Sequence, residues 1–264
     1  MIIDLSGHRA IVSGSTAGIG FAIATGLAKA GAAVVINGRQ KQTTDKAVQR
    51  LSGLAPNAKI EGIAGDLGSR AGIDDFLRRA GDADILVNNL GIFEPKPFTE
   101  ITDDDWHRFF DVNVMSGVRL TRHYFPAMLA KNWGRVVFIS SESGLNIPAE
   151  MIHYGVTKTA QLALARGLAE LTAGTGVTVN SVLPGPTRSE GVEDFVKAMA
   201  KERGVSESEI ERSFFAEVRP SSLLKRFASV EEVANMVVYV CSKEASATNG
   251  AALRVDGGVV RSIA

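Results

Sequence analysis

The sequence predicts an α/β fold built on one doubly wound parallel sheet. Short apolar runs rich in Val and Ile alternate with stretches of helical period along most of the chain. Several runs are apolar at nearly every position, which is typical of strands that helices cover on both faces. A chain of 264 residues can bury about three quarters of its unfolded surface. We therefore expect a single domain over residues 1–264.

Strands and helices alternate in a regular order along the chain. The apolar runs that predict strands are Arg9–Ser13, Ala33–Asn37, Lys59–Ala64, Ile85–Asn88, Arg135–Ser140, Val177–Val182 and Ala251–Val255. The helical patterns between them span about 18–30, 41–53, 70–80, 103–131, 153–173 and 230–241. No linker, repeat or low-complexity segment interrupts this order, so one continuous sheet is favoured.

A charged helical segment, about 188–226, is inserted between the sixth and seventh strands. Gly204 is expected to end one helix in the left-handed conformation, and Ser206 with Glu209 forms a capping box for the next. Apolar side chains give both helices an apolar face. This face predicts either ordinary core packing or a helical lid over a substrate pocket at the carboxyl ends of the strands.

Composition excludes several classes of function. Lys plus Arg and Asp plus Glu number 29 each, so no net charge attracts nucleic acid or an anionic membrane. Cys241 is the only cysteine, which excludes an intrachain disulfide and suits a reducing compartment. Four scattered histidines give no metal-ligand spacing, and no apolar run reaches the length of a membrane span. We expect a cytoplasmic protein without a metal, nucleic-acid or membrane partner.

A glycine-rich segment, Ser13-Gly14-Ser15-Thr16-Ala17-Gly18-Ile19-Gly20, follows the first strand and opens the first helix. A tight turn there directs backbone N–H groups and a helix N-terminus at a phosphate. No Gly-Lys-Ser/Thr follows, so the segment is not a P-loop. It predicts a dinucleotide site with contacts from Gly14, Ser15, Thr16, Gly18, Ile19 and Gly20.

The ends of the next strands suggest how a nucleotide would be held. Arg39 follows the second strand, where an acidic residue would repel a 2′-phosphate, so NADP(H) is favoured over NAD(H). Alternatively, Arg39 only starts the following helix in solvent. Asp66, followed by Leu67, either accepts from the adenine amino group or serves as a turn residue. Asn88 and Gly91 end the fourth strand, either lining the nucleotide cleft or stabilising the strand end.

Tyr154 and Lys158 are four residues apart in a predicted helix, with Ser141 upstream. Residues i and i+4 share one helix face, so the lysine faces the tyrosine. A unit charge at about 4 Å, with an effective dielectric constant of ~20, is worth roughly 4 kcal/mol, or about three pKa units. We therefore expect Lys158 to lower the pKa of Tyr154 into the range for proton transfer. The alternative is an ordinary surface pair.

Together these residues resemble the short-chain dehydrogenase/reductase family, and the resemblance covers nearly the whole chain. It rests on the glycine-rich turn, Asp66, Asn88-Asn89-x-Gly91, Asn113, Ser141, Tyr154 with Lys158, Pro184-Gly185 and Asp256-Gly257-Gly258. It implies a Rossmann-like seven-stranded parallel sheet in one domain, the helical insertion at about 188–226, and a homotetramer or homodimer. It also implies an NAD(P)(H)-dependent oxidoreductase that interconverts a secondary alcohol and a ketone.

The resemblance also assigns roles to single residues. Ser141 would bond the substrate carbonyl, Tyr154 would act as general acid or base, and Lys158 would lower its pKa and hold the nicotinamide ribose. Asn113 would position Lys158 through a water. Pro184, Gly185, Thr187 and Ser189 would face the nicotinamide carboxamide, so the cofactor contacts include Tyr154 and Lys158 as well.

Some positions depart from the family pattern or leave the assignment open. Leu90 stands where alanine is usual, so it either narrows the space beside the cofactor or packs behind the fourth strand. Ser140 and Ser143 lie near Ser141, so the choice of serine rests on its spacing to Tyr154. We interpret His153 as packing or as pocket lining.

The substrate is expected to be a small carbonyl compound or alcohol. A largely apolar pocket is predicted from Phe93-Glu94, from Ser143 to Met151 including Pro148, and from the inserted helices. Acyl thioesters, sugars, polyols, steroids and aromatic ketones all remain candidates. A nucleotide-binding sensor without chemistry and a sugar-nucleotide epimerase are the competing functions. The absence of a G-x-S-x-G elbow argues against a serine hydrolase.

Overall fold

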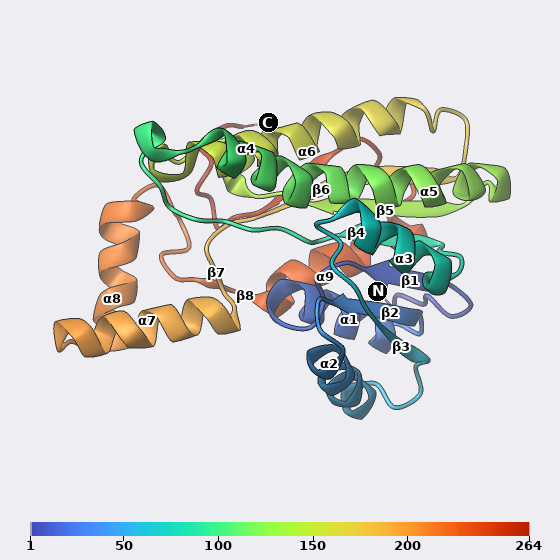
Figure 1. Ribbon diagram of the computed structural model, residues 1–264, viewed down its shortest axis with the longest axis horizontal. Coiled ribbons are helices and arrows are strands. Elements are labelled where there is room, and N and C mark those ends of the chain that lie inside the picture. Colours follow the sequence, from blue (N-terminus) through green and yellow to red (C-terminus); the bar gives the residue numbers. More distant parts are fainter. Residues whose placement is uncertain (1, 264) are drawn as a thin grey trace.

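The computed structural model describes residues 2–263 and contains a seven-stranded parallel sheet in the order β3-β2-β1-β4-β5-β6-β9 (Figure 1). All seven predicted strands are confirmed, with shifts of one or two residues at some ends. They are β1 Arg9–Val12, β2 Ala33–Gly38, β3 Ile60–Ala64, β4 Ile85–Asn88, β5 Gly134–Ile139, β6 Val177–Pro184 and β9 Ala252–Val255.

The strand order reverses next to β1, at the centre of the sheet. Ala10 of β1 is paired with Val34 of β2 on one side and with Ile85 of β4 on the other. The connections after β1 and after β4 therefore leave toward opposite edges. In open parallel sheets this reversal opens a crevice at the carboxyl ends of the strands, where ligands bind.

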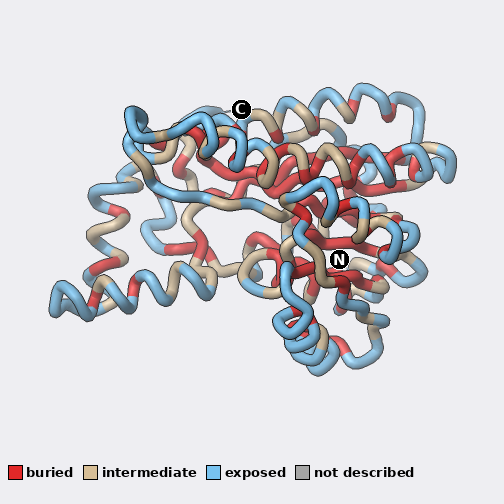
Figure 2. Tube along the Cα trace, in the orientation of Figure 1, coloured by how far each residue is buried: buried red, intermediate tan, exposed pale blue. Residues whose placement is uncertain are grey.

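Helices cover both faces of the sheet, so its inner strands are almost wholly buried (Figures 1 and 2). One buried cluster joins the sheet to α1 Gly18–Lys29, α2 Lys41–Leu54 and α9 Val230–Val240. The other joins it to α3 Arg70–Ala80, α5 Ser116–Lys131 and α6 Ile152–Glu170. Short 3₁₀ turns lie at Phe98–Glu100, Glu142–Gly144, Ala149–Met151 and Lys243–Ala245. The doubly wound arrangement is thus confirmed.

The helix predicted over 103–131 is not continuous. α4 Asp103–Phe110 leads into a π-helix, Asp111–Met115, before α5 begins. A π-segment adds a residue to the turn and rotates the side chains that follow, and such segments are frequent at functional sites. Asn113 lies inside it, so this departure bears on the predicted site.

The insertion forms two helices, α7 Glu190–Arg203 and α8 Glu207–Ser213, then a second π-helix, Phe214–Val218. The two helices extend away from the sheet (Figure 1). A two-stranded pair, β7 Thr187–Arg188 with β8 Ala228–Ser229, closes the base of the insertion and was not predicted. The expected caps are confirmed: Gly204 has φ +65°, and Ser206 with Glu209 forms a capping box.

The inserted helices have a small core of their own, which contains Val196, Phe215 and Phe227. It is separate from the two clusters that cover the sheet. Ordinary packing thus accounts for part of their apolar face. A movement of these helices as a lid over the substrate pocket stays a prediction. Within residues 2–263, no helix is both long and apolar enough to cross a membrane.

A buried leucine in α1 tests the packing of this layer. Leu27 is fully buried, so Leu27→Ala is expected to lower the free energy of unfolding by about 2–5 kcal/mol in denaturant titrations. The matched control is Leu171→Ala, whose side chain is 64% exposed and whose loss should change stability by less than about 0.5 kcal/mol. Equal effects at both positions would contradict this packing.

Candidate functional site

A cavity of about 790 Å³ lies at the carboxyl ends of the strands, between the sheet and the insertion. The structure brings to its wall nine of the residues predicted for the site, from five separate parts of the chain. They are Ile19, Gly91, Ser141, Tyr154, Lys158, Pro184, Gly185, Thr187 and Ser189. The cavity thus unites the predicted acid/base group with part of the predicted nucleotide contacts.

Ser141 is the serine that meets Tyr154. Its hydroxyl lies close enough to the phenol to favour the ionised form of Tyr154. The other two serines are engaged elsewhere: Ser140 donates to the carbonyl of Lys158 at 2.8 Å, and Ser143 donates to Glu142 at 3.2 Å. The geometry therefore favours the choice made from spacing alone.

Lys158 is buried beneath the cavity floor and is held by the backbone. Its Nζ donates to the carbonyl of Ile139 at 3.0 Å and lies 5.6 Å from the centre of the Tyr154 ring. Burial lowers the pKa of Lys158 to about 8, because the charged ammonium loses its hydration. The helical spacing thus places the two side chains on one face, as predicted.

The predicted lowering of the tyrosine pKa is wrong for this structure. Burial raises the pKa of Tyr154 to about 12, and the negative charge of Glu142 adds to the rise. The neighbouring Ser141 and the charge of Arg219 act in the opposite direction but are weaker. Tyr154 is half-buried at the cavity, and the loss of hydration around its hydroxyl outweighs the effects that favour the phenolate.

Asn113 is buried within the π-helix and joins three segments. Its Oδ1 accepts from the backbone N–H of Ile92 at 2.8 Å, and its Nδ2 donates to the Ile92 carbonyl and to Thr157, both at 3.0 Å. A side chain at Gly91 would lie 3.3 Å from Lys158 Nζ and 3.5 Å from Asn113 Oδ1. Asn113 therefore fixes the loop after β4 against α6. Sequence reasoning did not identify Thr157.

The glycine-rich turn has the shape of an anion-binding turn. Gly14 and Gly18 have φ values of +59° and +54°, and a side chain at Gly20 would collide with the amide of Asn89 and with the Gly14 carbonyl. No side chain caps the N-terminus of α1, where Ala17 is the N-cap residue. The backbone N–H groups of this helix end therefore need an outside acceptor.

Three predicted cofactor contacts turn their side chains into the protein. The Ser15 hydroxyl is fully buried and bonds to the backbone at the ends of β1 and β2. Leu67 belongs to the core cluster on the α3 side of the sheet. Asn88 donates to Thr121, while its Oδ1 is buried without a partner in the described chain. For Ser15 and Leu67, only the backbone can reach a ligand.

Asn89 and Leu90 connect the end of β4 to the glycine-rich turn. Asn89 Nδ2 donates to the carbonyls of Ser13 and Gly14 at 3.0 and 2.8 Å. Leu90 packs against the core, and a side chain at Gly14 would lie 3.3 Å from its Cδ1. Leu90 does not line the large cavity, which favours the packing alternative for this unusual residue.

Arg39 and Asp66 lie at the far end of the crevice, at the ends of β2 and β3. Arg39 is exposed, and no ion pair engages it within residues 2–263. Asp66 is also exposed, and its Oδ1 accepts from the Gly68 N–H at 3.1 Å, so it forms the turn that was one alternative. Thr16 is half-buried beside Gly38. Both acidic and basic side chains therefore remain accessible to a nucleotide.

The walls of the large cavity differ in part from the prediction. Phe93, Ser143 and Met151 line it, whereas Pro148 does not. Glu94 is also absent from the wall and instead forms an ion pair with Arg108 at 2.6 Å. Apolar side chains of the insertion cover much of the remainder: Val192, Phe195, Val196, Met199, Ile210, Phe214 and Phe227.

His153 packs in the protein interior and does not line the cavity. It is fully buried, with its ring 4.0 Å from that of Phe109 and edge-on to Trp106. Of the two alternatives, packing is therefore confirmed. Burial lowers the pKa of His153, as expected for an imidazole surrounded by aromatic rings.

A charged cluster on the cavity wall was not predicted from the sequence. Arg219, just after the second π-helix, forms ion pairs with Glu142 at 3.0 Å and with Glu150 at 3.3 Å. No spacing rule joins residues so far apart in the chain. Glu142 follows the predicted catalytic serine directly, and that adjacency was the only available signal.

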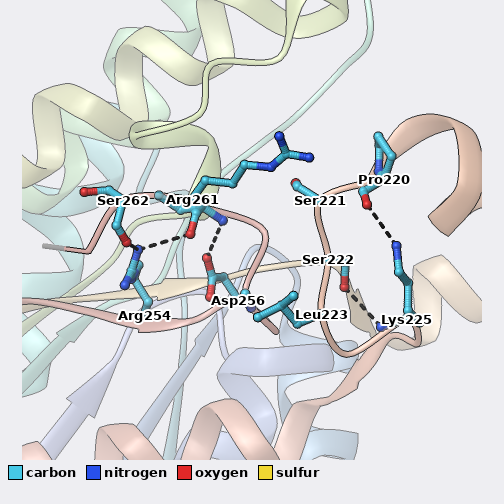
Figure 3. Close-up of a pocket in the computed structure, with 11 residues that line it drawn as sticks. Pro220, Ser221, Ser222, Leu223, Lys225, Arg254, Asp256, Arg261 and Ser262 are labelled. Atoms are coloured by element: carbon cyan, nitrogen blue, oxygen red, sulfur yellow. Dashed lines mark hydrogen bonds between the residues drawn. The ribbon is translucent and has the colours of Figure 1, made fainter.

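A second cavity, of about 600 Å³, lies between the loop 220–225 and the C-terminal segment (Figure 3). Arg254 donates to the carbonyls of Val260 and Ser262, which closes one side of it. Gly257 has φ +62°, and its carbonyl accepts from the N–H groups of Leu223 and Leu224. The Asp-Gly-Gly element thus holds the end of the insertion.

Within the described residues, no group of three His, Cys, Asp or Glu side chains is arranged to hold a metal.

Comparisons with known proteins agree with this architecture. The sequence profile of the family described as enoyl-(acyl carrier protein) reductase matches residues 14–260. The "uncharacterized oxidoreductase YvaG" of Bacillus subtilis is 48% identical, and the match covers 100% of both chains. D-beta-hydroxybutyrate dehydrogenase of Cupriavidus necator is 33% identical, over 97% of this chain and 99% of that protein. The crystal structure of L-sorbose reductase from Gluconobacter frateurii, complexed with NADPH and L-sorbose, has a TM-score of 0.92 and 31% identity, covering 100% of both chains.

The buried lysine gives a prediction for stability against pH. Because the pKa of Lys158 is about 8 in the folded chain and the ordinary lysine value is 10.5, the folded chain binds fewer protons than the unfolded chain between these values. The free energy of unfolding of the wild type, relative to Lys158→Met, should therefore rise by about 2–3 kcal/mol between pH 8 and pH 10 in denaturant titrations. Lys41→Met, which removes an 82% exposed lysine, should follow the wild type. A difference that does not vary with pH would contradict the assignment.

Proposed function

The chain belongs to the short-chain dehydrogenase/reductase family, and we propose that it interconverts a secondary alcohol and a ketone by hydride transfer. The observation that carries the proposal is the meeting of Ser141, Tyr154 and Lys158 at the wall of one cavity. Carbonyl reduction needs a proton donor and a second hydrogen-bond donor at the same oxygen. These two hydroxyl groups supply both.

In the reducing direction, Tyr154 gives the proton. Its raised pKa keeps the phenol protonated at neutral pH, which is the form that a general acid requires. Ser141 donates to the carbonyl oxygen and stabilises the negative charge that forms on it. As the carbonyl carbon is reduced, the phenolic proton passes to that oxygen and yields the alcohol. In the reverse direction the phenolate takes the proton back.

Lys158 and Asn113 assist this proton transfer without giving up the proton themselves. The ammonium of Lys158 lies on the same helix face as Tyr154 and stabilises the phenolate that remains after proton transfer. Asn113 acts as a positioning residue, because it fixes the Ile92 backbone and Thr157 on either side of the lysine. Its role does not require contact with the substrate.

The described residues fit a nicotinamide dinucleotide. The glycine-rich turn leaves no room for side chains and presents an uncapped helix N-terminus, which suits a pyrophosphate. Pro184, Gly185, Thr187 and Ser189 would hold the nicotinamide end. When bound, this cofactor supplies or accepts the hydride.

Arg39 supports a preference for NADP(H). Its exposed guanidinium follows β2, where no carboxylate competes for the ribose hydroxyls. A planar guanidinium binds phosphate through paired hydrogen bonds. The relative that was crystallised with NADPH agrees with this preference. By family membership, we also propose one catalytic domain, a homodimer or homotetramer, and a cytoplasmic location.

The first test is turnover. NADPH and NADH oxidation should be measured across ketones that include short aliphatic, hydroxylated, carboxylated and aromatic compounds, with Tyr154→Phe beside the wild type. We expect the phenylalanine variant to lose at least about 10³-fold in kcat/KM, since it has no proton to give. Cofactor binding, followed by fluorescence, should be retained. Activity that survives in Tyr154→Phe would overturn the proposed role of Tyr154, whereas cofactor binding without turnover of any ketone would favour the sensor function.

A second test concerns the choice of cofactor. Arg39→Gln should raise KM for NADPH about 10- to 100-fold and leave KM for NADH within about threefold, since only the 2′-phosphate contact is lost. The exposed Arg70, in the first turn of α3, provides the control variant Arg70→Gln. An equal change in both cofactor constants would show that Arg39 does not read the 2′-phosphate.

A further inference from the structure

The cavity beside Tyr154 contains a charged cluster that the proposed reaction does not use. It consists of the nearly buried Arg219 and Glu142 and the half-exposed Glu150. The Arg219 side chain is only 11% exposed, and its Nε donates to Glu142 Oε1 at 3.0 Å. Its Nη1 donates to Glu150 Oε1 at 3.3 Å and to the carbonyl of Val218 at 2.9 Å. The cluster therefore joins the insertion to the segment that carries Ser141.

The location of this cluster points to a role beyond stability. A buried ion pair contributes little net stability, because desolvation offsets the attraction between its charges. Glu142 is 4% exposed and follows Ser141 directly in the chain. Both Glu142 and Arg219 influence the ionisation of Tyr154, in opposite directions, so they lie within electrostatic range of the phenol. A substrate bound to Ser141 and Tyr154 would lie next to them.

The charges of the cluster disfavour an anionic substrate. The single guanidinium of Arg219 already faces two carboxylates, so a third carboxylate from a substrate would meet an environment that is negative overall. The whole cavity wall adds no compensating field. Its carboxylates, Glu142, Glu150 and Glu217, equal in number its cationic groups, Lys158, Arg203 and Arg219.

The remaining hydrogen-bonding capacity of the cluster suits a hydroxyl group. Within residues 2–263, Arg219 Nη2 makes no hydrogen bond, so the guanidinium retains donors. Each carboxylate oxygen has two lone pairs, and Glu150 Oε1 accepts only from Arg219. A hydroxyl group both donates and accepts, so it can satisfy this neighbouring donor and acceptor together. A methylene group at the same position would leave them unpaired.

We propose that Arg219, with Glu142 and Glu150, binds a hydroxyl group close to the reacting carbon of the substrate. The substrate class is then the neutral hydroxy ketones, with the corresponding vicinal diols in the reverse direction. This inference rests on the proposed ketone–alcohol reaction and makes it more specific. The apolar side chains of the insertion would contact the remainder of the substrate.

Three small ketones test the proposal because they differ at one position only. Hydroxyacetone carries a hydroxyl group where butanone carries a methyl group, and acetoacetate carries a carboxylate. We expect kcat/KM for hydroxyacetone to exceed that for butanone at least about tenfold, with acetoacetate no better than butanone. In Arg219→Gln this ratio should fall below about three, and Arg219→Lys should give an intermediate ratio. A merely structural defect would lower kcat/KM for hydroxyacetone and for butanone equally, and would leave the ratio of the two values unchanged.

A matched control comes from another ion pair of the insertion. Glu190 pairs with Arg50 of α2 at 3.0 Å on the surface, and neither residue lines the cavity. Glu190→Gln should therefore keep the wild-type ratio.

Distinct results would overturn this inference and leave the reaction class standing. They are equal turnover of butanone and hydroxyacetone, a preference for acetoacetate, or an unchanged ratio in Arg219→Gln. The absence of turnover with every ketone of the wider panel would instead overturn the reaction class and this inference together.

Discussion

The burial of the Lys158 ammonium is the constraint on which the site depends. An amine that is removed from water must find acceptors in the protein, and here the carbonyl of Ile139 at the end of β5 supplies one at 3.0 Å. That bond fixes α6 against the sheet and so positions Tyr154, which lies one helical turn before Lys158. A side chain at Gly91 would be crowded by the lysine and Asn113, which occupy the adjacent space. One buried charge thus determines the positions of β5, α6 and the loop after β4.

Burial also sets the protonation states from which the chemistry starts. The same desolvation raises the pKa of Tyr154 to about 12 and lowers that of Lys158 to about 8. Both shifts disfavour the charged form of the side chain. The phenol of Tyr154 therefore stays protonated, and the ammonium of Lys158 loses its proton near pH 8. The protonated phenol is the form needed to reduce a carbonyl. Oxidation would require the phenolate, which Ser141 and Lys158 must stabilise against that burial.

The sequence was sufficient for the sheet and for the residues that meet at the cavity. Runs such as Ile85-Leu86-Val87 are apolar at every position, so they predicted strands covered on both faces, and the i,i+4 spacing alone placed Lys158 beside Tyr154. The π-helix at Asn113 was not predictable, because its extra residue is held by hydrogen bonds to Ile92 and Thr157 from elsewhere in the fold. The predicted lowering of the Tyr154 pKa was wrong for a similar reason. Local spacing gives the attraction between two charges but not the depth at which the fold buries them.

The division between sheet and insertion explains why the same sequence reveals the reaction and conceals the substrate. The side chains proposed for proton transfer lie on α6 and in the turn just after β5, where strand and helix patterns are regular and the spacing of residues can be read. The remaining walls come from helices whose charged residues, in the sequence, look like a solvated surface. Arg219 is such a residue, yet it reaches back to Glu142, beside Ser141, and is nearly buried there. A segment far along the chain can therefore change what the cavity accepts while the groups that perform the reaction stay fixed by the sheet.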